Sequence, residues 1–259
     1  MNIVVCAKQI PDPENMNNIS FADNRLVRED VELIINPFDS YAMEMAAQIK
    51  DKNEGTKIIA LTFGKDQAKK VLKECVSVGA DKAYLVSDPC FAGSDTYETA
   101  KAISKAIKKI EETEGKIDVI VCGKQSADGE NAQIGPMIAA LLEYPCITGC
   151  VDGSVAEGGL LMKKELDAGH AMINVSLPCV ITMAVADFQP RFPTIKTKMA
   201  ANRAEINVLT AADIEADNPG FENARVTVKT IAPAPKRGEC VMEKNAADLV
   251  AKLRELHAV

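Results

Sequence analysis

The sequence contains no tryptophan and only two histidines among its 259 residues. His170 follows a glycine in a predicted turn and His257 lies near the C-terminus, so neither fits a Ser-His-Asp or Cys-His arrangement. The H-E-x-x-H pattern and other clusters of metal ligands are also missing, and we predict no metal site. These absences favour binding over catalysis by the chain's own side chains.

Positive charge is scarce as well. The 30 Lys and Arg residues are outnumbered by 37 Asp and Glu, which gives a net charge of −7. No basic stripe offsets this charge, so we expect no nucleic-acid partner. Every apolar run is shorter than ten residues, which predicts neither a signal peptide nor insertion into a membrane. We therefore expect a cytoplasmic protein.

The eight cysteines form no C-x-x-C pair. The spacing of Cys146 and Cys150 has no second pair that would complete a zinc site. Most of the others lie in apolar runs, as Cys6, Cys122 and Cys179 do. We therefore expect reduced cysteines that behave as small buried hydrophobic residues.

Apolar strand patterns alternate with helical patterns over about the first 140 residues. Strands are predicted at 2–7, 56–64, 83–86 and 117–122, and helices at 40–52, 66–76, 96–112 and 132–142. This alternation predicts an α/β fold with a doubly wound, mostly parallel, Rossmann-like sheet. A hairpin at 19–31, turning at Asp23-Asn24, is expected to lie over that sheet.

The pattern changes after about residue 145. Short strands separated by glycine-containing turns are predicted at 147–155, 160–166, 172–177 and 179–185. We expect all four as an antiparallel extension at one edge of the sheet. One more strand is predicted at 226–231.

The stretch 119–136 combines a buried strand, a polar loop and a helix start. Unpaired N–H groups at a helix start attract anions, and a phosphate is the usual one. Asn131 and Asp128 are candidate helix caps. The loop matches neither named glycine-rich phosphate motif, so an ordinary turn with polar caps stays open. The phosphate interpretation depends on the many hydrogen-bonding side chains of the loop, which are Lys124, Gln125, Ser126, Asp128, Asn131 and Gln133.

Ligands of doubly wound sheets bind beyond the carboxyl ends of the strands, where the strand order reverses. Lys8, Asn36, Phe63 and Gly123 all lie at or just after predicted strand ends. We therefore expect them to surround one cleft. The acidic residues of this region more often cap a helix or bind a ribose hydroxyl than act as paired catalytic carboxylates.

The segment 187–203 contains two prolines and shows no clear period, which predicts an ordered loop or arm. Phe192 and Ile195 are apolar where a loop is usually polar, so this segment is a candidate partner surface. That both side chains fold back on the body stays an open alternative. Lys196, Lys198 and Arg203 add positive charge that would attract an acidic partner.

The C-terminal region begins with a proline-rich stretch at 232–238, which predicts a tether. An amphipathic helix is predicted at 246–256. We expect it to dock on the same body or on a partner. The domain prediction is therefore an α/β nucleotide-binding domain at 1–231 and a tether with a helix docking on a partner subunit at 232–259.

Five motifs together resemble those of electron transfer flavoprotein beta subunits. They are V-C-A-K-Q-I-P-D at 5–12, N-P-F-D at 36–39, T-F-G at 62–64, G-K-Q-S-A-D-G-E-N-A-Q-I-G-P at 123–136 and P-R-F-P-T-I-K at 190–196. The resemblance covers essentially the whole chain. It implies a heterodimer with an alpha subunit that carries FAD.

The resemblance also implies a site for an adenine nucleotide. In simple members this is a structural AMP, and in electron-bifurcating members it is a second FAD beside which NADH docks. The loop resembles the bifurcating version, in which Gly129 would give a side-chain-free approach. The implied cofactor-binding residues are Cys6, Ala7, Lys8, Asn36, Asp39, Phe63, Gly123, Lys124, Gln125, Ser126, Asp128, Gly129, Asn131, Ala132, Gln133 and Ile134.

In bifurcating relatives the electrons of NADH are divided between ferredoxin or flavodoxin and, through the alpha-subunit FAD, a flavin dehydrogenase such as an acyl-CoA dehydrogenase. The resemblance implies partner contacts by Phe192, Ile195 and Lys196, with Ile195 at the anchor position. The basic run after Met199 is thinned here, which leaves the dehydrogenase open. An ATP-hydrolysing enzyme and an adenosine-binding module without redox function are the alternatives from other classes.

Overall fold

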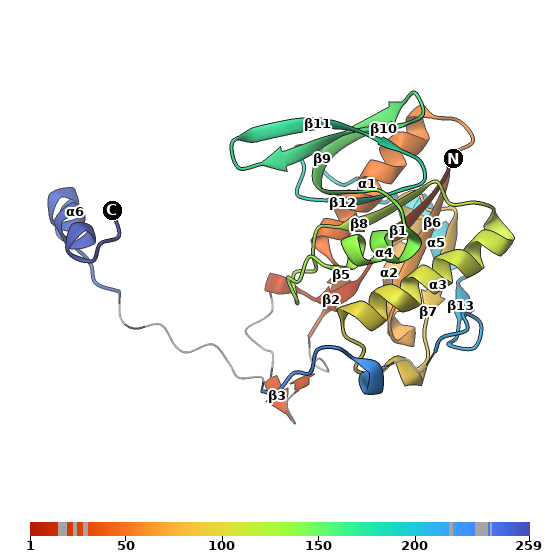
Figure 1. The fold of residues 1–259 in the computed structure, drawn as a ribbon, viewed down its shortest axis with the longest axis horizontal. Coiled ribbons are helices and arrows are strands. Elements are labelled where there is room, and N and C mark those ends of the chain that lie inside the picture. The colour runs from red at the N-terminus through yellow and green to blue at the C-terminus, as the bar shows by residue number, and fades with distance from the viewer. Residues whose placement is uncertain (15–19, 23–24, 28–30, 218–219, 231–237, 239) are drawn as a thin grey trace.

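The computed structural model describes residues 1–14, 20–22, 25–27, 31–217, 220–230, 238 and 240–259. Its centre is a nine-stranded sheet with the strand order β11-β10-β9-β12-β8-β1-β6-β7-β13 (Figure 1). These strands are β1 (Asn2–Cys6), β6 (Lys57–Phe63), β7 (Lys82–Val86), β8 (Val119–Gly123), β9 (Cys146–Ala156), β10 (Gly159–Leu166), β11 (Gly169–Ser176), β12 (Cys179–Met183) and β13 (Asn207–Leu209). The helices are α1 (Pro37–Lys52), α2 (Lys69–Ser77), α3 (Thr96–Glu114), α4 (Ile134–Leu142), α5 (Ile195–Asn202) and α6 (Ala246–Glu255).

The predicted doubly wound, mostly parallel sheet is confirmed. Strands β9, β12, β8, β1, β6, β7 and β13 all run parallel to one another. Helices α1 and α2 pack on one face of the sheet, whereas α3 and α4 pack on the other. Because both faces are covered, the central strands are apolar along nearly their whole length.

The strand order reverses between β1 and β8. From β1 the chain proceeds through β6 to β7, and it then returns to place β8 on the opposite side of β1. Cys6 and Cys122 are register partners at the carboxyl ends of these two strands. This reversal is the switch point at which open α/β sheets bind their ligands.

The predicted antiparallel extension is correct for β9, β10 and β11, which form a meander ending at the sheet edge. The prediction is wrong for 179–185. Strand β12 lies inside the sheet, parallel to β8 on one side and to β9 on the other, and all five of its residues are buried. An unbroken apolar run suits a strand covered on both faces better than an edge strand.

Three further predictions differ from the structure. The segment 195–202, expected as a loop, is helix α5. Residues 226–230 form no strand. Two short strands, β3 (Ser20–Ala22) and β4 (Arg25–Val27), are antiparallel partners, as the predicted hairpin requires. They form a separate two-stranded sheet, and the predicted turn at 23–24 lies outside the described residues. A second small sheet joins β2 (Gln9–Pro11) to β5 (Leu33–Ile35).

The C-terminal helix was predicted correctly at 246–256. Asn245 caps α6, accepting a hydrogen bond from the backbone N–H of Asp248. Helix α6 contributes no buried residue, and Figure 1 draws it apart from the sheet. The predicted tether at 232–238 lies outside the described residues except for Gly238.

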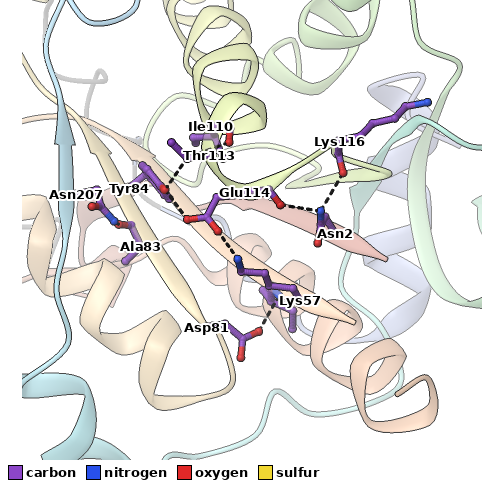
Figure 2. A network of polar contacts seen from close by, with 11 residues as sticks. Asn2, Lys57, Asp81, Ala83, Tyr84, Ile110, Thr113, Glu114, Lys116 and Asn207 are labelled. Carbon is purple, nitrogen blue, oxygen red and sulfur yellow. Dashed lines mark hydrogen bonds and ion pairs between the residues drawn. The ribbon is translucent and has the colours of Figure 1, made fainter. Parts of the chain in front are cut away.

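A polar network closes the amino ends of the strands (Figure 2). The Glu114 carboxylate, at the end of α3, accepts a hydrogen bond from the Tyr84 hydroxyl at 2.6 Å and pairs with the Lys57 ammonium. The Asn2 side-chain amide donates to the carbonyl groups of Glu114 and Lys116, at 3.1 and 3.0 Å. Burial raises the pKa of the Glu114 carboxyl, but the hydrogen bonds from Lys57 and Tyr84 outweigh it and hold that pKa below its ordinary value. The network fixes α3 to β1, β6 and β7.

We predict that Glu114→Gln lowers the free energy of unfolding by about 1–2 kcal/mol at neutral pH, because the variant loses a charged acceptor. The lowered pKa means that the charged Glu114 carboxylate stabilises the folded protein above the pKa of the unfolded state. This stabilisation is lost as the pH falls. The difference between wild type and variant should therefore shrink below about pH 4 in denaturant titrations. Glu112→Gln, on the exposed face of the same helix, should change stability by less than about 0.5 kcal/mol. A difference that is unchanged in acid would contradict the assignment.

Candidate functional site

The loop after β8 ends in a helix start that no side chain caps. Helix α4 begins at Ile134, two residues later than predicted, and its N-cap residue Gln133 makes no capping hydrogen bond. The predicted caps Asn131 and Asp128 are therefore wrong. Pro136 brings no N–H group to this first turn, which leaves the N–H groups of Ile134 and Gly135 as its backbone donors.

Left-handed backbone conformations precede this helix start. Glu130 and Ala132 have φ values of 50° and 53°, which non-glycine residues seldom adopt. Gly129 is the residue that we expect to let a nucleotide approach closely. Its φ value does not lie in this left-handed range. Its backbone therefore does not require glycine.

Asn36 and Asp39, at the start of α1, contact protein backbone. The buried Asn36 side chain donates from Nδ2 to the Gln125 carbonyl at 2.9 Å and accepts at Oδ1 from the Ala127 N–H at 3.1 Å. Asp39 accepts at Oδ2 from the Lys8 N–H at 2.7 Å and at Oδ1 from the Gly123 N–H at 3.0 Å. The two side chains thus join α1 to the carboxyl ends of β1 and β8.

Burial raises the pKa of the Asp39 carboxyl to about 7, even though the hydrogen bonds from Lys8, Asn36 and Gly123 favour the charged form. The side chain is only 5% exposed, so desolvation is the dominant cause. Gly123 is close to this carboxyl: a Cβ atom added there would lie 2.3 Å from Asp39 Oδ1. Glycine at 123 is thus explained by packing against Asp39.

Lys8 extends from the end of β1 to the loop. Its ammonium donates to Asp128 Oδ1 at 2.6 Å and to Ser126 Oγ at 3.2 Å. The Asp128 side chain is only 4% exposed, so this ion pair is shielded from water on one side. On the neighbouring strand the Thr62 hydroxyl donates to the Ala7 carbonyl. Phe63 packs on Phe91 with their ring centroids 5.0 Å apart.

The structure brings most of the predicted cofactor residues together at the switch point. We call Lys8, Asn36, Asp39 and the loop 123–134 the switch-point site. Within it Lys124, Gly129, Asn131, Ala132 and Gln133 are exposed, whereas Gln125, Ser126, Asp128 and Ile134 are half-buried. Cys6 and Ala7 are buried beneath it. The exposed members are the ones that can reach a ligand.

Sequence reasoning missed several residues beside this site. The Thr96 hydroxyl, at the start of α3, donates to Gln133 Oε1 at 2.8 Å. A cavity of about 360 Å³ adjoins the start of α4 and is lined by Lys124, Ala132, Pro136, Thr148, Gly149, Lys164, Glu165 and Thr182. Thr182 lies on β12, which the sequence analysis placed at the sheet edge, so no local signal pointed to this cavity.

The described part of the chain holds neither a cluster of metal-ligand residues nor a long apolar helix. No group of three or more His, Cys, Asp or Glu side chains there is arranged to hold a metal ion. No helix among those residues is both long and apolar enough to cross a membrane. The expected burial of cysteines holds for five, and Cys90, Cys146 and Cys240 are exposed.

The candidate partner segment, residues 187–203, presents two large apolar side chains to solvent. Phe192 is 91% exposed and Ile195 is 81% exposed, so neither folds back on the body. Thr194 caps α5, with a capping box completed by Thr197, and this local signal explains why the expected loop is a helix. Lys196 is exposed on the same helix.

An ion pair holds the base of this segment. Arg191 binds Glu44 on α1 with both Nε and Nη2, at 2.7 and 3.1 Å, and Asp51 with Nη2 at 2.8 Å. A cavity of about 700 Å³ lies beneath, between α1, α2 and α5, with Tyr41 and Met43 among its apolar walls. The segment therefore spans a cavity, and Arg191 connects it to α1.

The chain is similar to known proteins along most of its length. Residues 23–214 match the family described as "Electron transfer flavoprotein domain". The chain is 41% identical to electron transfer flavoprotein subunit beta of Megasphaera elsdenii, over 92% of this chain and 89% of that protein. It is 35% identical to caffeyl-CoA reductase-Etf complex subunit CarD of Acetobacterium woodii, with both chains fully covered. Protein FixA of Azotobacter vinelandii is 38% identical, over 99% of this chain and 96% of that protein.

The buried Asp39 carboxyl yields a pH prediction. Its raised pKa means that the folded protein holds this proton better than the unfolded chain does, so the free energy of unfolding falls as pH rises from about 4 to about 7. Asp39→Asn cannot titrate and should lose this slope, which is at most about 1.4 kcal/mol per pH unit. Denaturant titrations across this range measure it. The exposed Asp66→Asn, used as a control, should keep the wild-type slope, and an Asp39→Asn variant that also keeps it would refute the shift.

Proposed function

The chain belongs to the electron transfer flavoprotein family as a beta- or FixA-type electron-transfer subunit, and from this premise we propose that its switch-point site binds FAD and accepts electrons from NADH. The observation that carries this proposal is the uncapped start of α4 at the reversal of strand order. A nucleotide phosphate fits such a helix start, because it satisfies the N–H groups and the helix dipole together.

The residues present fit a dinucleotide. The N–H groups of Ile134 and Gly135 would hold a phosphate, with the exposed side chains of Asn131 and Gln133 beside it. Lys124 lies both on the loop and in the lining of the 360 Å³ cavity, so its ammonium can neutralise further phosphate charge. FAD, when bound, supplies the transfer of one or two electrons, while these residues bind and orient it.

We further propose that the complex bifurcates electrons. One electron of NADH would pass to ferredoxin or flavodoxin, and the other would pass through the FAD of an alpha subunit to a flavin dehydrogenase. The relative from Acetobacterium woodii is named as a subunit of a caffeyl-CoA reductase complex. That name supports a dehydrogenase of acyl-CoA type as the partner of this chain.

A structural AMP is the second candidate ligand. The uncapped start of α4 suits the single phosphate of AMP equally well. Gly129, the residue that suggested the larger nucleotide, has a backbone conformation open to other residues. In this version the chain still transfers electrons as part of a heterodimer, but its own nucleotide takes no part in the transfer.

The two exposed parts of the chain are proposed as partner contacts. The partner segment offers Phe192, Ile195 and Lys196 to a dehydrogenase. Helix α6 exposes Leu249 and Val250, and Leu256 is exposed at its C-terminal end. An apolar face on a helix with no buried residue favours docking on another chain, here the alpha subunit.

Counting the nucleotides of the purified heterodimer tests the proposed function. We expect two FAD molecules per heterodimer and bleaching of the flavin absorbance by NADH, because both nucleotide sites would then carry flavin. Chromatography of the released nucleotides measures this. One FAD with one AMP would reject bifurcation and leave electron transfer intact, whereas a colourless heterodimer would reject both.

Ile195→Ala tests the docking segment. Loss of a central apolar anchor should weaken docking of the dehydrogenase by about 2 kcal/mol, or roughly thirtyfold, because anchors carry most of the binding free energy at such interfaces. Titration of the rate of dehydrogenase reduction measures the change. Val208→Ala, which truncates a half-exposed residue on β13, serves as the control. An unchanged rate for Ile195→Ala would show that the anchor lies elsewhere.

A further inference from the structure

Asn36 was expected to contact the nucleotide, but its position argues for another role. The residue is 1% exposed, and it lies between β5 and α1. A side chain that binds a ligand must direct its polar groups to that ligand. Both polar groups of the Asn36 amide are instead paired with the backbone of the loop after β8.

The two hydrogen bonds of the Asn36 side chain bracket residue 126, and we call them the clamp. Nδ2 donates to the carbonyl of Gln125 at 2.9 Å, and Oδ1 accepts from the N–H of Ala127 at 3.1 Å. One amide thus fixes both sides of residue 126, much as a neighbouring strand would. The loop cannot change its path between 125 and 127 without breaking two hydrogen bonds at a buried side chain.

The clamp is itself anchored. The backbone N–H of Asn36 donates to the Lys8 carbonyl at 2.9 Å, and its carbonyl accepts from the N–H of Asp39 at 2.9 Å. The Asp39 carboxyl then binds the N–H groups of Lys8 and Gly123. The loop is therefore held at its start through Asp39 and at its middle through Asn36, both against the end of β1.

We propose that Asn36 is a positioning residue, which holds the 123–134 loop in its nucleotide-binding conformation before a nucleotide arrives. This inference rests on the proposed function of the switch-point site. A loop that is already ordered loses less conformational entropy on binding, so the clamp contributes to affinity without touching the ligand. Ser126, the residue that the clamp brackets, is also the one whose hydroxyl accepts from Lys8.

The chain offers a matched control for Asn36. Asn2 also binds two backbone groups through its side-chain amide, the carbonyls of Glu114 and Lys116. It lies at the amino end of β1, whereas Asn36 contacts the residues that follow the carboxyl end. Replacing either residue by alanine removes two side-chain-to-backbone hydrogen bonds, and only one of the two replacements releases the loop.

The test compares Asn36→Ala with Asn2→Ala in the heterodimer after its nucleotides have been removed. Calorimetric titration with AMP and, separately, with FAD measures affinity, and the rise in Tm that each nucleotide produces gives a second readout. We expect both variants to lower the Tm of the nucleotide-free protein. Asn36→Ala should also weaken nucleotide binding by about tenfold or more, while Asn2→Ala stays within about twofold of wild type.

Asn36→Asp gives a readout that simple destabilisation would not change, and it serves if the alanine variant does not fold. The carboxylate can still accept from Ala127, but it faces the Gln125 carbonyl without a proton to donate. It also faces the Asp39 carboxyl, which the Asn36 amide stabilises in its charged form in wild type, so the two carboxyl groups disfavour each other's charge at neutral pH. Nucleotide affinity relative to wild type should therefore fall at neutral pH and recover as pH is lowered and the carboxyl gains a proton. A relative affinity independent of pH would overturn the inference.

The outcomes separate the two claims. A wild-type protein that binds neither AMP nor FAD would overturn the proposed function and this inference with it. A wild type that binds while Asn36→Ala binds as well as Asn2→Ala would overturn the inference alone. Selective loss of affinity in Asn36→Ala, together with pH-dependent recovery in Asn36→Asp, supports the positioning role.

Discussion

The desolvated hydrogen bonds between the start of α1 and the carboxyl ends of β1 and β8 are the contacts on which the switch-point site depends. Asp39 accepts from the backbone of Lys8 and of Gly123, and Asn36 pairs with Gln125 and Ala127. All of these side-chain groups are buried, so each would leave an unsatisfied partner if removed. The loop consequently has one favoured path across the strand ends, and that path leaves the start of α4 uncapped.

The polar groups at the two ends of the sheet have different roles. At the amino ends, Glu114, Tyr84 and Lys57 form a polar network that fixes α3 to the strands. At the carboxyl ends, polar groups are likewise paired with backbone, but they surround the uncapped helix start at which we propose that a nucleotide phosphate binds. The proposed partner contacts lie elsewhere again, on α5 and α6, which add little to the core. A shared α/β body can thus serve different partners through segments that hardly affect its stability.

For the strand at 179–185 the error concerns pairing rather than element type. The run 179–185 was correctly identified as a strand, but nothing in its residues states which strand it will join. Its parallel position between β8 and β9 is decided by the chain's return after the β9–β11 meander. Thr182 and the cavity beside α4 were missed for this reason. Asn36 and Asp39 show a related limit, because a motif gives the residue type and not the direction of its polar groups, which here pair with backbone.

The sequence by itself determined the alternation of strands and helices, the doubly wound class and the region of the site, because hydrophobic periodicity and strand-end residues are local properties. Five motifs spread over the chain also indicated the electron transfer flavoprotein family. Only the tertiary structure decided that Gly123 is required by Asp39, that α4 starts uncapped at Ile134, and that Phe192 and Ile195 face solvent. These features depend on contacts between residues far apart in the chain, and no local pattern encodes such contacts.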